Sequence, residues 1–190
     1  GGVSDAMNGV AAFDYYSDAS IWLHRSWFFY GNFTIALGVG SCCGGEEAAA
    51  TTGNVTVSLD QRLLNAAGTV TVGGSGRAPR ILLPNTHGGY QPVSSPRYTA
   101  AAVAAAAKSA SETVDDTWIY NGGGVAYSWR HRETAPVSAF VGNQTGSWNA
   151  ITQTNDTTPV SKGIFAAKID LGAVQGGGRN LSYAYTLHPG

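Results

Sequence analysis

Four histidines are the side chains in this sequence best suited to acid–base chemistry or to binding a metal ion. None has a carboxylate or a second histidine at the spacing that would place both on one face as metal ligands. Each is therefore expected to have a structural role. They are His24, His87, His131 and His188. His87 is the strongest candidate of the four for contact with a ligand, because the Gly-rich segment from Asn85 to Tyr90 can bring backbone and imidazole close to one. It is still not assigned a catalytic role. The sequence therefore predicts no catalytic residue, no metal site and no cofactor.

Two further groups of side chains could contact a carbohydrate. The charged run from Arg130 to Glu133 can meet an acidic glycan, although a solvated strand end explains it equally well. The tryptophans have flat faces on which sugar rings can stack, but we expect most of them in the core. They are Trp22, Trp27, Trp118, Trp129 and Trp148. Trp27 and Trp148 lie in alternating strand patterns, which favour packing over binding.

Asparagine is the best indicator of the cellular compartment. Five asparagines open an Asn-X-Ser/Thr triplet, the acceptor for N-glycosylation, although a Thr-rich β protein can also accumulate such triplets by chance. They are Asn32, Asn54, Asn143, Asn155 and Asn180. Triplets between or beside strands, such as those at 143 and 155, suit a bulky sugar that points into water. The sequence therefore predicts a secreted or cell-surface glycoprotein.

The two cysteines, Cys42 and Cys43, are adjacent in the sequence. Neighbouring residues of a strand point to opposite faces, so a disulfide between these two would be strained. Pairing with cysteines outside this chain and burial of two reduced thiols are both compatible with the sequence.

Charge and hydropathy exclude two classes of partner. Charged residues make up 12% of the chain, the net charge is -1, and the few cations are scattered, so no surface for a phosphate backbone is expected. No apolar stretch approaches the roughly 20 residues that a membrane-spanning helix needs. The segment from Gly1 to Val10 lacks the features of a signal peptide.

Short apolar runs bounded by Gly, Asn, Asp and Pro indicate about eleven strands and an all-β, antiparallel β-sandwich. The strict alternation in Asn54 to Leu59 and in Leu181 to Leu187 is typical of half-buried antiparallel strands. The other clear strands are predicted at 20–30, 33–39, 69–72, 117–120, 124–129, 138–141, 147–151 and 163–169.

One long segment departs from this strand pattern. Residues 73–112 are rich in Gly and Pro and are expected to form an elaborated connection rather than core. Within it, the Ala-rich run at 100–107 has high helix propensity but no amphipathic stripe, so it can be a short helix or a loop. No domain boundary is evident, and residues 1–190 are interpreted as one β-sandwich domain or most of one.

Several short sequence motifs occur in one order along nearly the whole chain. Together they resemble the later part of the central domain of polysaccharide lyase family eight, which includes hyaluronate, chondroitin and xanthan lyases. The motifs are Arg25 to Phe29 (RSWFF), Ile35 to Gly40 (IALGVG), Thr51-Thr52 with Val57 to Leu63 (VSLDQRL), Trp118 to Tyr127, Thr145 to Ile151, Phe165 to Gly172, and Tyr183 to Gly190. Three departures from the family pattern weaken any inference about substrate. Asp170-Leu-Gly replaces the usual Asp-His-Gly, Gln144 stands where Arg is common, and the connection from Arg62 to Trp118 is longer than usual.

The resemblance implies a super-sandwich, similar to galactose mutarotase, that supports β-elimination of uronic-acid polysaccharides. In that family the catalytic Asn, His, Tyr and Arg come from an N-terminal α/α-toroid, which this chain lacks. Glu46 and Glu47 lie in a different context from the family's Glu, so no catalytic residue is carried over. We therefore expect a non-catalytic portion of a secreted lyase-like protein, with an acidic polysaccharide or another extracellular glycan as partner. The alternative is a structural or adhesive glycoprotein module without lyase activity, which can contact other chains of an extracellular assembly.

Overall fold

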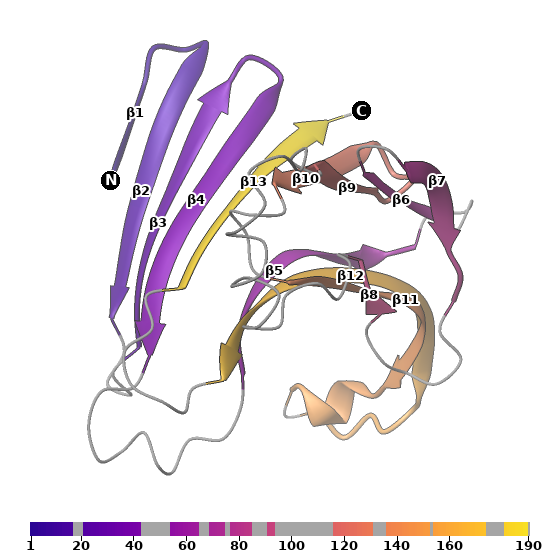
Figure 1. Cartoon of the computed structure of the whole chain (residues 1–190). Helices are drawn as coiled ribbons and strands as arrows, with labels where there is room; N and C mark the ends of the chain where they lie inside the picture. Colours follow the sequence, from indigo (N-terminus) through magenta and orange to yellow (C-terminus); the bar gives the residue numbers. More distant parts are fainter. Residues whose placement is uncertain are drawn as a thin grey trace.

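The computed structural model describes residues 1–16, 21–42, 54–64, 69–74, 77–84, 91–93, 116–130, 136–152, 154–173 and 181–189. These residues form two stacked antiparallel sheets (Figure 1). The larger sheet has nine strands in the order β1-β2-β3-β4-β13-β10-β9-β6-β7. Its strands are β1 (Gly2–Ser4), β2 (Asn8–Tyr16), β3 (Ile21–Tyr30), β4 (Phe33–Cys42), β6 (Val70–Gly74), β7 (Arg77–Leu82), β9 (Asp116–Tyr120), β10 (Val125–Arg130) and β13 (Leu181–Pro189).

The smaller sheet has four strands in the order β5-β12-β11-β8. They are β5 (Asn54–Leu63), β8 (Gln91–Pro92), β11 (Val137–Gly146) and β12 (Val160–Ala173). Its longest strand, β12, is paired with β11 along the whole of β11, from Val137 opposite Ile169 to Gly146 opposite Val160. Pairing of β12 with β5 stops at Ile164, so the end of the β11–β12 hairpin beyond it is a two-stranded arm.

The hydrophobic core lies between the two sheets. Alternate residues of each strand point to one face, so each sheet contributes one row of apolar side chains per strand. The larger sheet supplies Val70, Val72, Ile119, Tyr127, Trp129 and Tyr183, and the smaller sheet supplies Val57, Leu59, Val137, Ala139, Val141, Phe165, Ala167, Ile169 and Leu171. Full burial of one Val, Leu, Ile or Phe side chain contributes about 1.5–3 kcal/mol to the free energy of folding. The sum over these residues holds the two sheets together.

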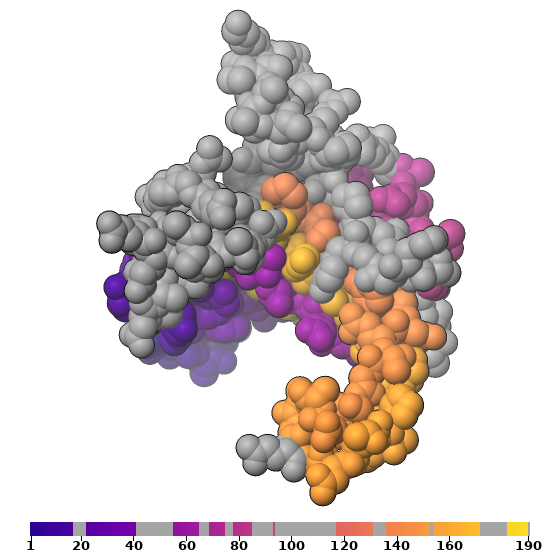
Figure 2. Space-filling view, turned by 90° about the horizontal axis from the view of Figure 1, so that it is seen from below, coloured from indigo at the N-terminus to yellow at the C-terminus, as the bar shows by residue number. Residues whose placement is uncertain are grey.

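The N-terminal strands extend beyond the core. The side chains of β2 and β3 include Phe13 at 50%, Tyr15 at 45% and Phe29 at 46% exposure, whereas Tyr127 and Tyr183 of the central strands are almost fully buried. Figure 2 shows the N-terminal strands and the end of the β11–β12 hairpin as two separate projections with an open bay between them. One part of the larger sheet therefore stands without the cover that the smaller sheet gives to the rest.

The structure confirms the all-β antiparallel sandwich predicted from the sequence. The strand predicted at 147–151 is wrong: Trp148–Ala150 is a 3-10 turn, and the backbone N–H of Ile151 bonds to the carbonyl of Trp148 instead of a neighbouring strand. The alternation of apolar and polar residues in this segment is typical of a strand, but the segment only connects two strands. Strand β2 was not predicted, because its apolar residues occupy both faces and give no alternation.

The predicted connection at 73–112 is in part regular structure. It contains β7 and β8, and two of its residues, Leu82 and Val93, are buried in the core. The Ala-rich run at 100–107 lies outside the described residues. No helix in the described ranges is long and apolar enough to cross a membrane.

Candidate functional site

A row of four directly paired residues leads from the core to the exposed N-terminal strands. It runs from Tyr183 on β13 to Gly38 on β4, Arg25 on β3 and Phe13 on β2. Directly paired residues project to the same side of a sheet. Because Tyr183 belongs to the core, Arg25 and Phe13 also lie on the side of the larger sheet that faces the smaller sheet. We call this side the inner face and the opposite side the outer face.

Gly38 allows Arg25 and Tyr183 to meet across β4. The ring of Tyr183 lies over Gly38, where any Cβ atom would overlap it. Burial raises the pKa of Tyr183 above its ordinary value, while the charge of Arg25 and a hydrogen bond from it act in the opposite direction. Arg25 Nε is buried and has no hydrogen-bond partner among the described residues. Because Arg25 as a whole is only half-buried, part of its side chain reaches the surface of the inner face, while Nε itself is closed to solvent.

Aromatic side chains share the inner face with this cation. The rings of Phe13 and Tyr15 are stacked, with centroids 6.3 Å and planes 20° apart, and each ring is about half exposed. Trp27 and Phe29 follow Arg25 on β3 at a spacing of two, so they share its face. We call the set Phe13, Tyr15, Arg25, Trp27 and Phe29 the Arg25 shelf. A cation among exposed aromatic rings suits a ligand with an anionic group and a flat apolar body, such as a uronate sugar.

A second polar cluster links the two sheets. The carboxylate of Asp60 on β5, only 7% exposed, accepts a hydrogen bond from Arg62 Nε at 2.8 Å and another from Asn121 Nδ2 at 3.0 Å. Arg62 Nη2 also donates to the hydroxyl of Tyr127 on β10 at 3.4 Å. Burial, followed by the negative charge of Asp60, raises the pKa of Tyr127. These side chains satisfy one another across the sandwich, which indicates a structural link between the sheets.

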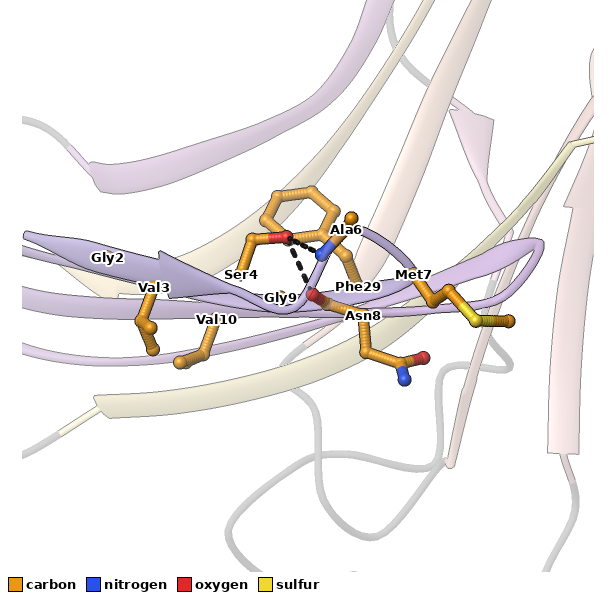
Figure 3. A pocket seen from close by; sticks show the side chains of 9 residues that line it. All are labelled: Gly2, Val3, Ser4, Ala6, Met7, Asn8, Gly9, Val10 and Phe29. Atoms are coloured by element: carbon orange, nitrogen blue, oxygen red, sulfur yellow. Dashed lines mark hydrogen bonds between the residues drawn. The ribbon is translucent and has the colours of Figure 1, made fainter.

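A hollow of about 420 Å³ lies at the β1–β2 hairpin (Figure 3). Ser4 Oγ donates to the carbonyl of Asn8 at 2.8 Å and accepts from the N–H of Ala6 at 3.1 Å. The carboxylate of Asp5 accepts from the backbone N–H groups of Asn8 and Met7, and these bonds lower its pKa. The polar side chains of this hairpin are thus engaged in shaping its turn. We assign no ligand to this hollow.

Comparison with known proteins identifies the family. A model described as the super-sandwich domain of polysaccharide lyase family 8 matches residues 1–190. The chain belongs to this family. No curated protein in the comparison matches the chain.

Two solved structures show the family 8 fold for the whole chain. One is a chondroitinase AC lyase studied in complexes with oligosaccharides, which is 22% identical with a TM-score of 0.67 over 100% of this chain. The other is the chondroitin AC lyase of Streptomyces coelicolor A3 in complex with chondroitin sulphate, which is 18% identical with a TM-score of 0.59 over 100% of this chain. This chain spans 22% and 19% of those two chains, about a fifth of their length.

Within this family 8 domain, the described histidines lie on the outer face or at its end. His24 Nδ1 pairs with Asp14 Oδ1 at 2.6 Å, and His188 Nε2 lies 3.0 Å from Ser128 Oγ. His87 and residues 131–133 of the charged patch lie outside the described residues. The described ranges contain no group of three or more His, Cys, Asp and Glu side chains arranged to hold a metal ion.

Three of the five predicted glycosylation sites have described side chains, and all three are exposed. Asn32 lies in the tight turn between β3 and β4, next to Gly31 with its φ of 56°. Asn143 lies on β11, and Asn155 lies in the loop between β11 and β12. Asn54 begins β5, but its side chain lies outside the described part, as does Asn180. The cysteine prediction also falls there, because neither the side chain of Cys42 nor any part of Cys43 is described.

The tryptophans divide between core and surface. Trp129 is 4% exposed and belongs to the core, as expected, and Trp22, Trp27 and Trp118 are half-buried. The expectation that Trp148 packs in a strand is wrong, since its side chain is 56% exposed on the loop of the β11–β12 hairpin. Sequence reasoning also missed Arg25 as a candidate. The available signal was the spacing of two that places it between aromatic residues on one face of β3.

Proposed function

We propose that this chain is the non-catalytic β-sandwich portion of a secreted lyase-like protein and supports β-elimination of uronic-acid polysaccharides together with a separate toroid domain. Membership of polysaccharide lyase family 8 supports the reaction class. The Streptomyces chondroitin AC lyase was solved with chondroitin sulphate, which supports an acidic glycan as the ligand. In this proposal the sandwich holds the polysaccharide, and the toroid supplies the chemistry.

The observation that carries the proposal is the environment of Arg25. Arg25 is half-buried on the inner face, and the rings of Phe13, its partner on β2, and of Tyr15 are each about half exposed. A uronate carboxylate or a sulphate group would accept from the guanidinium, and the apolar side of the sugar would stack on Phe13 and Tyr15. Charge-assisted hydrogen bonds of this kind are stronger than those between neutral groups.

The shelf would act by positioning the polysaccharide. In β-elimination a base removes the proton α to the carboxyl group, the carboxylate charge is neutralised, and the glycosidic oxygen leaves with a proton. We assign none of these steps to Arg25. A sugar held on the shelf would restrict the movement of the polymer, so that the unit to be cleaved stays aligned in the active site.

Titration of chondroitin sulphate oligosaccharides into the chain tests the proposal. We expect Arg25→Ala to weaken binding about tenfold, which corresponds to the loss of one hydrogen-bonded charge. Arg25→Lys should recover part of the affinity, because lysine keeps the charge but loses the planar donor pair. Arg80→Ala is the matched control: Arg80 is exposed on β7, at the opposite edge of the sheet from the N-terminal strands, and its loss should change little.

Two results would contradict the proposal. Equal weakening by Arg25→Ala and Arg80→Ala would mean that the glycan responds only to net charge. No binding of any acidic glycan by the wild-type chain would favour a structural or adhesive module instead. The chain alone should also release no unsaturated uronides from chondroitin, hyaluronan or xanthan, and a rise in their ultraviolet absorbance would show that it carries its own catalytic group.

A further inference from the structure

The outer face of the same strands carries a second hollow. It has a volume of about 380 Å³ and is lined by His24, Ser26, Leu37, Gly38, Val39, Ser182, Tyr183 and Ala184. His24 and Ser26 alternate with Arg25 on β3, and they pair with Val39 and Leu37 of β4. Ser182 and Ala184 of β13 pair with the same two β4 residues from the other side. The hollow thus lies across β3, β4 and β13, on the opposite side of the sheet from the Arg25 shelf.

A hydrogen-bonded pair adjoins this hollow: His24 lines it, and Asp14 on β2 is bonded to His24. His24 Nδ1 lies 2.6 Å from Asp14 Oδ1, and the side chains are 56% and 80% exposed. The ring of Trp22 lies against the imidazole, with centroids 4.9 Å and planes 56° apart. Asp14 keeps the imidazole in one orientation, so that Nε2 is the second hydrogen-bonding atom of the ring. The imidazole of His24 therefore lines the hollow and is itself in contact with the Asp14 carboxylate and the Trp22 indole.

The lining residues combine hydroxyl groups with an apolar surface. Ser26 and Ser182 supply hydroxyls that both donate and accept, and Leu37 is 41% exposed. The described lining residues include no arginine or lysine, and the imidazole of His24 is hydrogen-bonded to Asp14. This chemistry differs from that of the Arg25 shelf, which combines an arginine with aromatic rings.

We propose that this outer hollow binds a neutral, hydroxyl-rich sugar unit of a polysaccharide. The serines and His24 would exchange hydrogen bonds with the sugar hydroxyls, and Leu37 would contact the apolar side of the ring. The described lining residues include no arginine or lysine, which favours a neutral sugar over a uronate or a sulphated one. The inference goes beyond the proposed function, because it concerns the opposite face of the sheet and a different class of sugar.

Titration of neutral oligosaccharides (maltoheptaose, cellopentaose and chitopentaose) into the chain, followed by NMR or calorimetry, tests this inference. We expect at least one of them to bind in the millimolar range or tighter, and His24→Ala to weaken that binding about fivefold by removing one side-chain contact. Ser182→Tyr should also abolish binding by filling the hollow. Ser182 is exposed on a strand, where tyrosine is well tolerated, so this variant tests the site even if His24→Ala is unstable.

Arg80→Ala is the matched control for the outer hollow. Arg80 is exposed on β7, at the opposite edge of the larger sheet, so Arg80→Ala should leave the binding of neutral oligosaccharides unchanged. Failure of all three neutral oligosaccharides to bind would overturn the inference, and so would equal loss in Arg80→Ala and in the outer-face variants. The proposed function has a separate readout, because it predicts loss of acidic glycan binding in Arg25→Ala and none in Ser182→Tyr.

Discussion

Asp60 shows how a single residue joins the two sheets. Its carboxylate is removed from water, yet Arg62 and Asn121 satisfy it, and Asn121 Oδ1 in turn accepts from the backbone N–H of Gly123 at 2.8 Å. The cluster therefore fixes the Gly-rich turn between β9 and β10 to strand β5 of the other sheet. A buried charge that loses its partner is costly, whereas replacing both members of a pair is often tolerated.

Arg62→Met should lower the free energy of unfolding by about 2 kcal/mol at neutral pH, because it leaves the Asp60 carboxylate buried without its cation. This value is below the cost of breaking a fully buried pair, since Arg62 is 39% exposed and water screens part of the interaction. Asp60→Asn combined with Arg62→Met should recover part of the loss. Urea unfolding measures both, with the exposed Arg80→Met as control. A double variant as unstable as the sum of its single variants would contradict this account.

At the scale of elements, close contact between a ring and a glycine fixes β9 against β6. The ring of Trp118 lies over Gly73, where a Cβ atom would come within 2.5 Å of it. Gly73→Ala should therefore destabilise the chain by about 1–3 kcal/mol, because the indole has to move out of its packed position. Gly146→Ala on β11 is the matched control, since a Cβ atom there would meet nothing within 4 Å. Equal thermal stability of the two variants would show that Trp118 moves without cost.

The sequence predicted most strands because burial on one face leaves a spacing of two, as in β5 and β13. It did not predict β2, where Phe13 and Tyr15 lie on the inner face while Val10 and Tyr16 lie on the outer one. A strand with apolar residues on both sides has no alternation to detect. The spacing of two around Arg25 indicates that it shares a face of β3 with aromatic residues, but not that the smaller sheet leaves this face uncovered, so the Arg25 shelf was missed.

At the scale of the whole molecule, the order of the family-like sequence motifs predicted the β-sandwich that the structure and the family model show. The glycosylation sites remain a prediction. The side chains of Asn32, Asn143 and Asn155 are exposed, so an attached sugar would extend into water without disturbing the core.

We expect the chain, when produced through a eukaryotic secretory pathway, to carry glycans at Asn32, Asn143 and Asn155. Mass spectrometry of peptides after glycosidase treatment checks each site, and Asn32→Gln should remove one glycan without changing the thermal stability by more than a small amount. Asn149 is the internal control, because it does not open a triplet and its side chain donates to the carbonyl of Thr154 at 2.6 Å. Three bare asparagines in secreted protein would remove the main support for an extracellular location.

Strand β3 carries two surfaces in one stretch of ten residues, with Arg25 on one side and His24 on the other. Substitutions at odd and at even positions can therefore accumulate independently during evolution, each adapting one surface while the other is kept. Insertion or deletion of a single residue within the strand would exchange the two sets between faces. In related domains we expect this strand to vary by substitution and to keep its length.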